Sequence, residues 1–491
     1  MIVRITRAKV GHRQDPIPET PNQKPGWAFY FASTETDSIK LPDVWHPTAM
    51  FDRRIAQEPQ ETRHALKNIL VLFDADWDRE QLEKAARASG HQYRFYFEGF
   101  DLFSFPSNAR LLSFDIFKFV ARLGRKYKNK NLHGVTSSNE QFGALTAALL
   151  AEKLGLPGAS PKAIIAAQHK YIARRIVGQD VPEANVKYSA FPYTFRSAAE
   201  LGLKFPFFVK PVKAAYSVLA RRVDTFSQLQ EHMTFHPWEK YIIKRLVRPF
   251  NDAVRRLTDF HVDAHWMLAE ELIDGHQINV DGVAINGTVH ALGVVDSVMY
   301  PGTDQFMRFE YPSRLPAEHV RNAKETAKRI VEALGIGHGL FNVEMRVCPS
   351  TGHCKMIEVN PRMAAQFSDL YEKVDGINLH DVALKIAAGE PVDLTPARGK
   401  YAVATSFVFR KFDGSTIGRT PSNHDIQWLK EFDPDAFLAL FIKTGNGLKR
   451  EMKWLGSHRY ATLNMGGESE ADLERKYLHV THRLGFEAAP K

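Results

Sequence analysis

The chain has 491 residues, of which 44% are hydrophobic and 25% are charged, and its formal net charge is +9. This length allows roughly three or four domains, and the composition is typical of a globular protein with sizeable cores. The two cysteines exclude a disulfide framework. The first residues lack the apolar region of a secretory signal, and no apolar run approaches the ~18 residues of a membrane helix. We therefore expect a cytoplasmic protein with no membrane partner.

The positive charge is spread along the chain rather than gathered in one block. A nucleic-acid binder would need a clustered basic face, so we expect no specific nucleic-acid partner. The scattered charge fits an enzyme that handles anions such as ATP.

The first 66 residues are irregular and turn-rich, and we assign them no function. Apolar runs over 68–74, 91–100 and 132–138 predict strands, and 78–90 has a helical pattern. Strand–helix alternation of this kind predicts a parallel α/β domain. No GxGxxG follows the first strand, so a dinucleotide site is not supported.

A helix is expected after the strand that ends near residue 138. Ser138 and Gln141 have the spacing of a capping box, and Gly155 suits the C-terminal end. Residues 159–205 are expected to be mostly helical.

The middle of the chain is rich in predicted strands. Residues 205–223 have the pattern of strand, loop and strand, 241–247 predicts a further strand, and 265–297 predicts antiparallel strands with glycine turns. Residues 316–335 follow the 3.6-residue period of an amphipathic helix. After residue 400 the pattern is strands followed by a final helix.

A hairpin is predicted over residues 341–363, where two β-like arms flank a Pro-Ser-Thr-Gly turn. Apolar residues alternate with polar ones in the first arm, as one buried face requires. If residues 349–353 form the loop, Cys348 lies opposite Cys354. We expect both cysteines to be reduced thiols, because the nearby histidine does not complete a zinc site.

The same register places Glu344 opposite Glu358, where two carboxylates repel. A divalent cation would remove this repulsion, since Mg²⁺ takes one or two carboxylates together with substrate phosphates. Asn360 adds an oxygen on the same face, and Arg362 has a guanidinium suited to phosphate or carboxylate. From the pattern alone, a solvated polar hairpin face is an equally good interpretation.

Four features occur in one order along the chain. Lys170 precedes a helix, Lys210 lies on a strand before a proline, 269–275 forms a short strand and glycine turn, and the acidic hairpin ends in Ile-Glu-Val-Asn-Pro-Arg. Together these features resemble the ATP-grasp superfamily over roughly residues 68–480. The closest resemblance is to its carboxylate–amine ligases, such as L-amino-acid ligases and D-alanine–D-alanine ligases.

This resemblance implies an ATP-grasp fold of mixed α/β and α+β class. Beyond the irregular segment 1–66, it implies a Rossmann-like pre-ATP-grasp domain over 67–160. An ATP-grasp domain would follow over 161–395, with a small lid subdomain at about 205–272, and an α+β extension over 396–491.

The resemblance also implies roles for individual residues. Glu344, Glu358 and Asn360 match the magnesium ligands, and Arg362 and Lys210 match catalytic residues that contact the transferred phosphate. The matched nucleotide-binding positions are Lys170, Lys210, Ser217, Glu270, Glu271, Leu272 and Gln277. Only one of the two adjacent acids need face the nucleotide, and we favour Glu270.

Three departures from the family pattern stand out. The loop after Lys210 lacks the usual glycines, Gln277 replaces a ribose-binding glutamate, and 363–366 is not glycine-rich. None removes a metal or phosphate ligand, so we expect an active enzyme.

The implied reaction uses ATP with Mg²⁺, for which Mn²⁺ is an acceptable substitute. ATP would phosphorylate a small-molecule carboxylate, such as an amino acid or small peptide, and an amine would then displace phosphate. Two alternatives stay open: a biotin-carboxylase-like carboxylase and a catalytically silent nucleotide-binding protein. The family often forms homodimers, and the sequence does not decide the oligomeric state.

Overall fold

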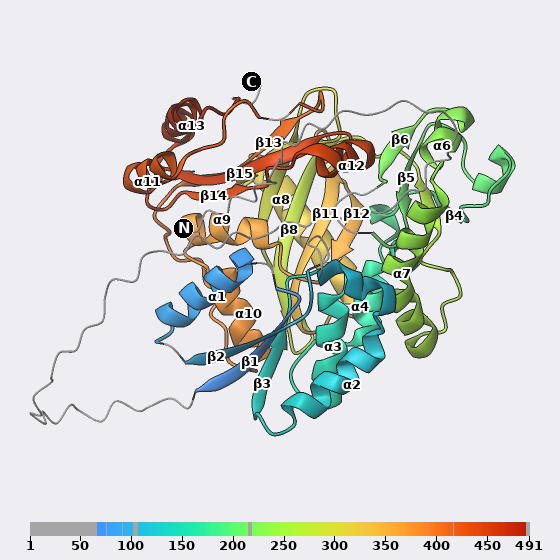
Figure 1. The fold of residues 1–491 in the computed structure, drawn as a ribbon, viewed down its shortest axis with the longest axis horizontal. Coiled ribbons are helices and arrows are strands. Elements are labelled where there is room, and N and C mark those ends of the chain that lie inside the picture. The colour runs from blue at the N-terminus through green and yellow to red at the C-terminus, as the bar shows by residue number, and fades with distance from the viewer. Residues whose placement is uncertain are drawn as a thin grey trace, which may run out of the picture.

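The computed structural model describes residues 66–74, 76–90, 92–101, 107–214, 219–415 and 417–487. The predicted irregular segment therefore lies almost wholly outside the described residues. Figure 1 shows an N-terminal domain below a large central sheet, with a smaller lid on one side. No helix in the described part of the chain is both long and apolar enough to span a bilayer.

The N-terminal domain contains a parallel sheet, as the sequence predicts, and its three strands have the order β2-β1-β3. Its elements are β1 (Lys67–Leu72), α1 (Asp76–Ala88), β2 (Tyr93–Glu98), η1 (Ser107–Ser113), α2 (Ile116–Tyr127), β3 (Leu132–Thr136) and α3 (Gly143–Leu154).

The predicted capping box of α3 is wrong. The helix starts later, after Phe142, and the Oδ1 of Asn139 accepts from the backbone amide of Phe142. Ser138 and Gln141 lie in the preceding loop, where their side chains donate to Asp78 and to the carbonyl of Leu246. The C-terminal end is confirmed, because Gly155 adopts the left-handed conformation with φ 66°.

The lid contains a separate four-stranded sheet with order β4-β7-β5-β6. The elements are α4 (Pro161–Gln168), α5 (Lys170–Asp180), η2 (Pro182–Ala184), β4 (Tyr188–Phe191), η3 (Ala198–Leu201), β5 (Phe207–Pro211), β6 (Arg221–Val223), α6 (Phe226–His232), α7 (Pro237–Leu257) and β7 (Met267–Glu270). Two helices, α4 and α5, come before the lid in the chain and pack outside its sheet.

The strand predicted at 241–247 is wrong, because this segment lies inside α7. A capping box formed by His236 and Glu239 begins the helix. Val247, Phe250 and Val254 are buried, and their spacing is helical. The seven-residue apolar window was too short to show this period.

The central sheet has eight strands in the order β12-β11-β8-β9-β10-β13-β15-β14, and every neighbouring pair is antiparallel. Its strands are β8 (His276–Ile285), β9 (Thr288–Met299), β10 (Phe306–Tyr311), β11 (Gly339–Val347), β12 (Cys354–Asn360), β13 (Val403–Lys411), β14 (Phe437–Leu440) and β15 (His458–Gly467). The sheet continues through the β10–β13 pair, so the strands after residue 400 belong to the same sheet as the strands over 276–360.

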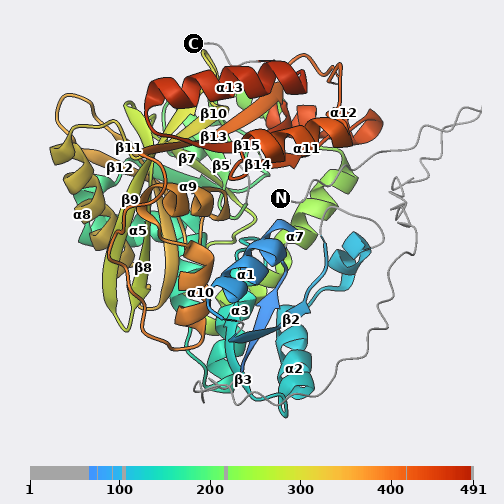
Figure 2. The same cartoon turned by 90° about the vertical axis from the view of Figure 1, so that its left-hand side faces the viewer.

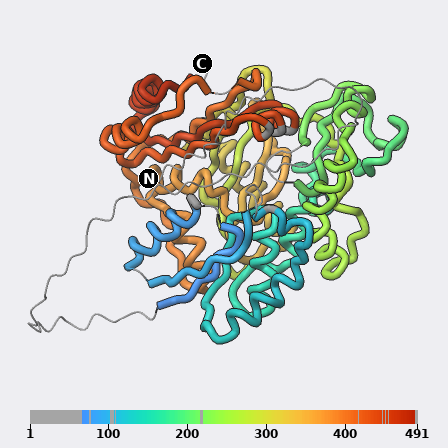
Figure 3. Tube along the Cα trace, in the orientation of Figure 1, coloured from blue at the N-terminus to red at the C-terminus, as the bar shows by residue number. Residues whose placement is uncertain are grey.

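Helices cover this sheet on both faces (Figures 2 and 3). They are α8 (Ala317–Ala333), α9 (Ala365–Asp375), α10 (Leu379–Ala387), α11 (Asn423–Phe432), α12 (Gly445–Leu455) and α13 (Glu470–Leu484). The amphipathic pattern predicted for α8 is confirmed: Ala323, Ala327 and Ile330 are fully buried in the core formed with β8 and β11. α9 and α10 pack on a second core that includes β10 and β13.

Candidate nucleotide and metal site

The predicted hairpin is formed by β11 and β12, and Glu344 lies directly opposite Glu358. The cysteine pairing is wrong, because Val347 rather than Cys348 lies opposite Cys354. A bulge explains both results: Met345 pairs with Met356 and Glu344 with Glu358, so Ile357 has no residue opposite it.

The bulge has a consequence for the site. The carbonyl oxygen of Ile357 accepts from the Nζ of Lys210 at 2.8 Å and from a guanidinium nitrogen of Arg174 at 3.4 Å. The irregular residue of the hairpin therefore helps to position two cations of the lid and α5 beside the carboxylates.

Glu344 and Glu358 form an acidic pair beside Asn360. Burial raises the pKa of Glu344 to about 8, and the charges of Glu358 and Glu140 add to the effect. Lys170 stands 3.1 Å from Glu358. A divalent cation between the two acids would favour the ionised form of both carboxyl groups.

Asn360 supports the same interpretation. Its amide nitrogen donates to Asn342 and to Glu344, both at 3.3 Å, while its buried Oδ1 has no hydrogen-bond partner among the described residues. A buried, unpaired carbonyl oxygen is costly unless something binds it. The described residues include no group of three or more His, Cys, Asp or Glu suited to a metal. Two carboxylates and one amide oxygen nevertheless fit Mg²⁺ if phosphate and water complete its coordination.

A buried ionic triad lies next to the acidic pair. Glu270 contacts Arg174 and Lys210, each at 2.8 Å, and all three side chains are almost fully buried. Burial alone would raise the pKa of Glu270, but the two cations outweigh it and lower the pKa. For Lys210, burial lowers the pKa despite Glu270. Lys210 and Glu270, which the sequence analysis placed separately at the nucleotide, therefore contact each other, with Arg174 in addition.

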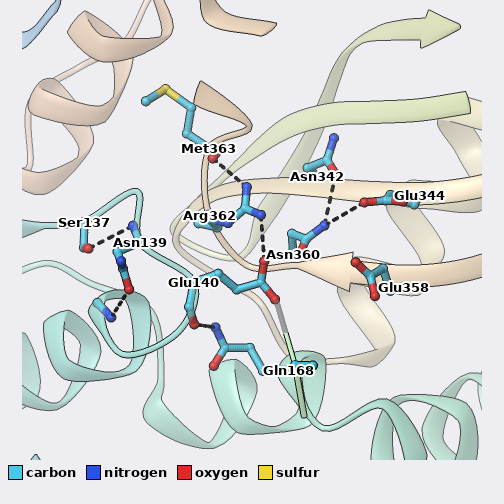
Figure 4. Close-up of polar contacts among 12 residues, drawn as sticks. Ser137, Asn139, Glu140, Gln168, Asn342, Glu344, Glu358, Asn360, Arg362 and Met363 are labelled. Carbon is cyan, nitrogen blue, oxygen red and sulfur yellow. Dashed lines mark hydrogen bonds and ion pairs between the residues drawn. The ribbon is translucent and has the colours of Figure 1, made fainter. Parts of the chain in front are cut away.

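Arg362 is bound by a residue of the N-terminal domain (Figure 4). Its Nη2 lies 2.7 Å from the Oε2 of Glu140, in the loop between β3 and α3. The carbonyl of Glu140 accepts from Gln168 at 2.9 Å and from Lys213 at 3.2 Å. Burial lowers the pKa of Lys213 to about 8.

The sequence reasoning missed Arg174, Glu140 and Lys213. Arg174 had a local signal, since it follows Lys170 by four residues on α5 and shares its face. Glu140 had none, because it is 222 positions from Arg362 in the chain.

All seven predicted nucleotide contacts stay predictions, and four of them lie outside the ionic cluster described above or outside the described residues. Glu271 is exposed and Leu272 is half-buried next to it, while Gln277 is buried opposite Arg346 in the β8–β11 pair. Ser217 lies outside the described residues.

The cluster has more cations than carboxyl groups. The cations are Lys170, Arg174, Lys210, Lys213 and Arg362, and the carboxyl groups are Glu140, Glu270, Glu344 and Glu358. With Glu344 mostly protonated at neutral pH, the excess positive charge favours a polyanionic ligand.

A model of the ATP-grasp domain family matches residues 203–369, which contain most of the lid, the hairpin and Arg362. The crystal structure of an L-amino acid ligase from Bacillus licheniformis has a TM-score of 0.62 and is 18% identical, over 85% of this chain and 98% of that one. A carboxyaminoimidazole ribonucleotide synthase from Aspergillus clavatus, complexed with ATP, has a TM-score of 0.60 and is 16% identical, over 86% of this chain and 98% of that one.

Curated relatives match at low identity. The uncharacterized protein y4rH of Sinorhizobium fredii is 26% identical over 61% of this chain and 58% of its own length. Carnosine synthase 1 of Gallus gallus is 27% identical over 50% of this chain and 26% of its own length. This chain thus matches less than two thirds of either relative. The domain model assigns residues 203–369 to the ATP-grasp domain family, and the solved structures show that most of the chain shares their fold.

Proposed function

We propose that the protein is an ATP- and Mg²⁺-dependent ligase that joins a carboxylate to an amine. The observation that carries this proposal is the facing pair Glu344 and Glu358, which lies beside the unpaired oxygen of Asn360. Buried lysine and arginine side chains surround this pair and outnumber the carboxyl groups. Transfer of a phosphoryl group depends on positioning of the reacting groups and on neutralisation of the phosphate charge. Oxygen ligands for a metal ion next to cationic side chains supply both.

Each side chain has a role in this reaction. Mg²⁺, held by Glu344, Glu358 and Asn360, would neutralise charge on the phosphate oxygens. Lys170 and Lys210 would bind phosphate oxygens from the opposite side. Both lysines now contact carboxylates of the protein, and the phosphates would compete for these contacts.

The reaction has two steps. A carboxylate oxygen attacks the γ-phosphorus of ATP, ADP leaves, and an acyl phosphate forms. The amine then attacks the acyl carbon, phosphate leaves with the former carboxylate oxygen, and the amine loses a proton. Arg362 would stabilise the charge on the transferred group in both steps. The contact between Arg362 and Glu140 holds Arg362 where the N-terminal domain meets the central sheet.

We take an amino acid or small peptide as the carboxylate and a second amino acid as the amine. The L-amino acid ligase and carnosine synthase support this choice, since both names describe joining of amino acids. The proposal includes a cytoplasmic location, where ATP and amino acids are both present.

Carboxylation with bicarbonate is a second candidate, because several carboxyaminoimidazole ribonucleotide synthases share the fold over 85–87% of the chain. Phosphate release that requires bicarbonate and an amine, but no amino-acid carboxylate, would favour it.

The test is phosphate release from ATP with Mg²⁺, screened over amino acids singly and in pairs. The Glu358→Ala protein is the control, since it should lose Mg²⁺ while keeping its fold. Release that requires a particular pair and is absent in the control supports the ligase. Release in the control within a few-fold of wild type would refute the metal assignment.

A further inference from the structure

The side chain of Asn360 belongs to a row of polar residues that crosses three strands. In the central sheet Asn360 lies opposite Asn342, and Asn342 lies opposite Asp281. Directly opposite residues share one face of a sheet, so the three side chains point to the same side. Asn342 and Asp281 are each 2% exposed, so water does not compete for their hydrogen bonds.

The hydrogen bonds along this row have one direction. The Nδ2 of Asn342 donates to the Oδ1 of Asp281 at 3.1 Å, and the Nδ2 of Asn360 donates to the Oδ1 of Asn342 at 3.3 Å. Tyr371 of α9 donates to the other oxygen of Asp281 at 3.0 Å. Figure 4 shows Asn342, Asn360 and Glu344 joined in this way.

Gly293 gives Tyr371 access to Asp281. It lies opposite Asp281 in the β8–β9 pair, and a Cβ at this position would stand 2.5 Å from the ring of Tyr371. A glycine there keeps the space through which the tyrosine hydroxyl reaches the carboxylate.

A carboxylate only accepts hydrogen bonds, whereas an amide can turn either its NH₂ or its oxygen toward a neighbour. Asn342 must therefore turn its NH₂ toward Asp281, and the oxygen of Asn342 then faces Asn360. Asn360 must then offer its NH₂ to Asn342, and the same NH₂ also donates to Glu344, so the amide oxygen is the atom that has no partner among the described residues. With the amide reversed, an NH₂ group would take the place of this unpaired oxygen and could not bind a metal.

We infer that Asn342 and Asp281 are positioning residues for metal binding, because the row they form holds the NH₂ of Asn360 and leaves its oxygen available to a cation. The inference rests on the proposed function, which assigns the metal to Glu344, Glu358 and Asn360. Neither positioning residue contacts the metal itself. Mutation of a residue that orients a metal ligand in this way typically lowers the affinity for the metal about ten- to hundredfold.

The test is titration of Mn²⁺ in the presence of ADP, followed by electron paramagnetic resonance of the free ion. It is run at about pH 8.5, because burial raises the pKa of Asp281 to about 7 and the carboxylate form is needed. Asn342→Leu removes the acceptor for Asn360 at similar volume, and we expect about ten- to hundredfold weaker binding of Mn²⁺. Asp281→Asn should have a smaller effect, because its oxygen can still accept from Asn342 in one of two orientations.

A matched control is Asn251→Leu. Asn251 is a buried asparagine that donates to Asp263, but it lies on α7 and has no connection to the row. Thermal unfolding should show comparable destabilisation for both leucine variants, while only Asn342→Leu loses affinity for Mn²⁺.

The outcomes separate the inference from the proposed function. If Glu358→Ala abolishes Mn²⁺ binding and Asn342→Leu stays within about twofold of wild type, the inference is wrong and the metal site stands. If Glu358→Ala binds Mn²⁺ as wild type does, the metal assignment is wrong and the inference falls with it.

Discussion

Binding of Mg²⁺ to this site should expel a proton from Glu344. The pKa of this carboxyl is about 8 because of burial first and the neighbouring Glu358 and Glu140 second. At pH 7 about one tenth of the population is ionised, and only the ionised form is a good ligand. Affinity for Mg²⁺ should therefore fall about tenfold, or about 1.4 kcal/mol, for each pH unit below 8. Above pH 8 the dependence should level off.

Calorimetric titration of Mg²⁺ with ADP, in buffers of different ionisation enthalpy, measures the protons released. We expect about 0.9 proton at pH 7 and about 0.1 at pH 9. The Glu344→Gln variant is the control, since it removes the titrating group and should bind weakly at both pH values. Equal heats in all buffers at pH 7, with tight binding of Mg²⁺, would refute the reasoning.

The remaining predictions concern charge and stability at the same site. Without metal, the wild-type protein should lose stability relative to Glu344→Gln as the pH rises from the ordinary glutamate pKa through 8, because the folded state favours the protonated form of Glu344. Urea unfolding of both proteins across this pH range measures the difference in free energy of unfolding, and a difference that stays constant would contradict the prediction. Arg174→Met should destabilise the protein by about 3–5 kcal/mol by leaving Glu270 one cation short, whereas the exposed Arg175→Met should not, and equal urea midpoints would refute this. Lys210→Ala should weaken ATP binding, as measured by calorimetry, and unchanged affinity would show that this lysine does not contact phosphate.

The alternation of the hairpin predicted its apolar face and its facing carboxylates, because a strand repeats every two residues. The same counting failed for the cysteines, since one bulged residue shifts the register and no feature of the sequence locates it. The ordered lysines predicted a cationic site, and the structure brings Lys170 to Glu358 and Lys210 to Glu270.

Contacts between distant segments could not be predicted. Glu140 reaches Arg362 only because the N-terminal domain packs against the hairpin, and no periodicity reports such a contact. The row that ends at Asp281 also depends on the order of three strands, which the sequence does not contain. The helix over 237–257 was missed for a local reason, because the period becomes visible only over several turns.

The central claim is that a carboxylate of the substrate is phosphorylated by ATP before an amine displaces phosphate. Its most direct test uses an amino acid labelled with ¹⁸O in the carboxylate, in the pair that supports turnover, with mass analysis of the phosphate released. The account predicts one ¹⁸O atom in each phosphate, because the acyl carbon loses that oxygen to phosphorus. Turnover to an amide with unlabelled phosphate, or with the label in AMP, would contradict it.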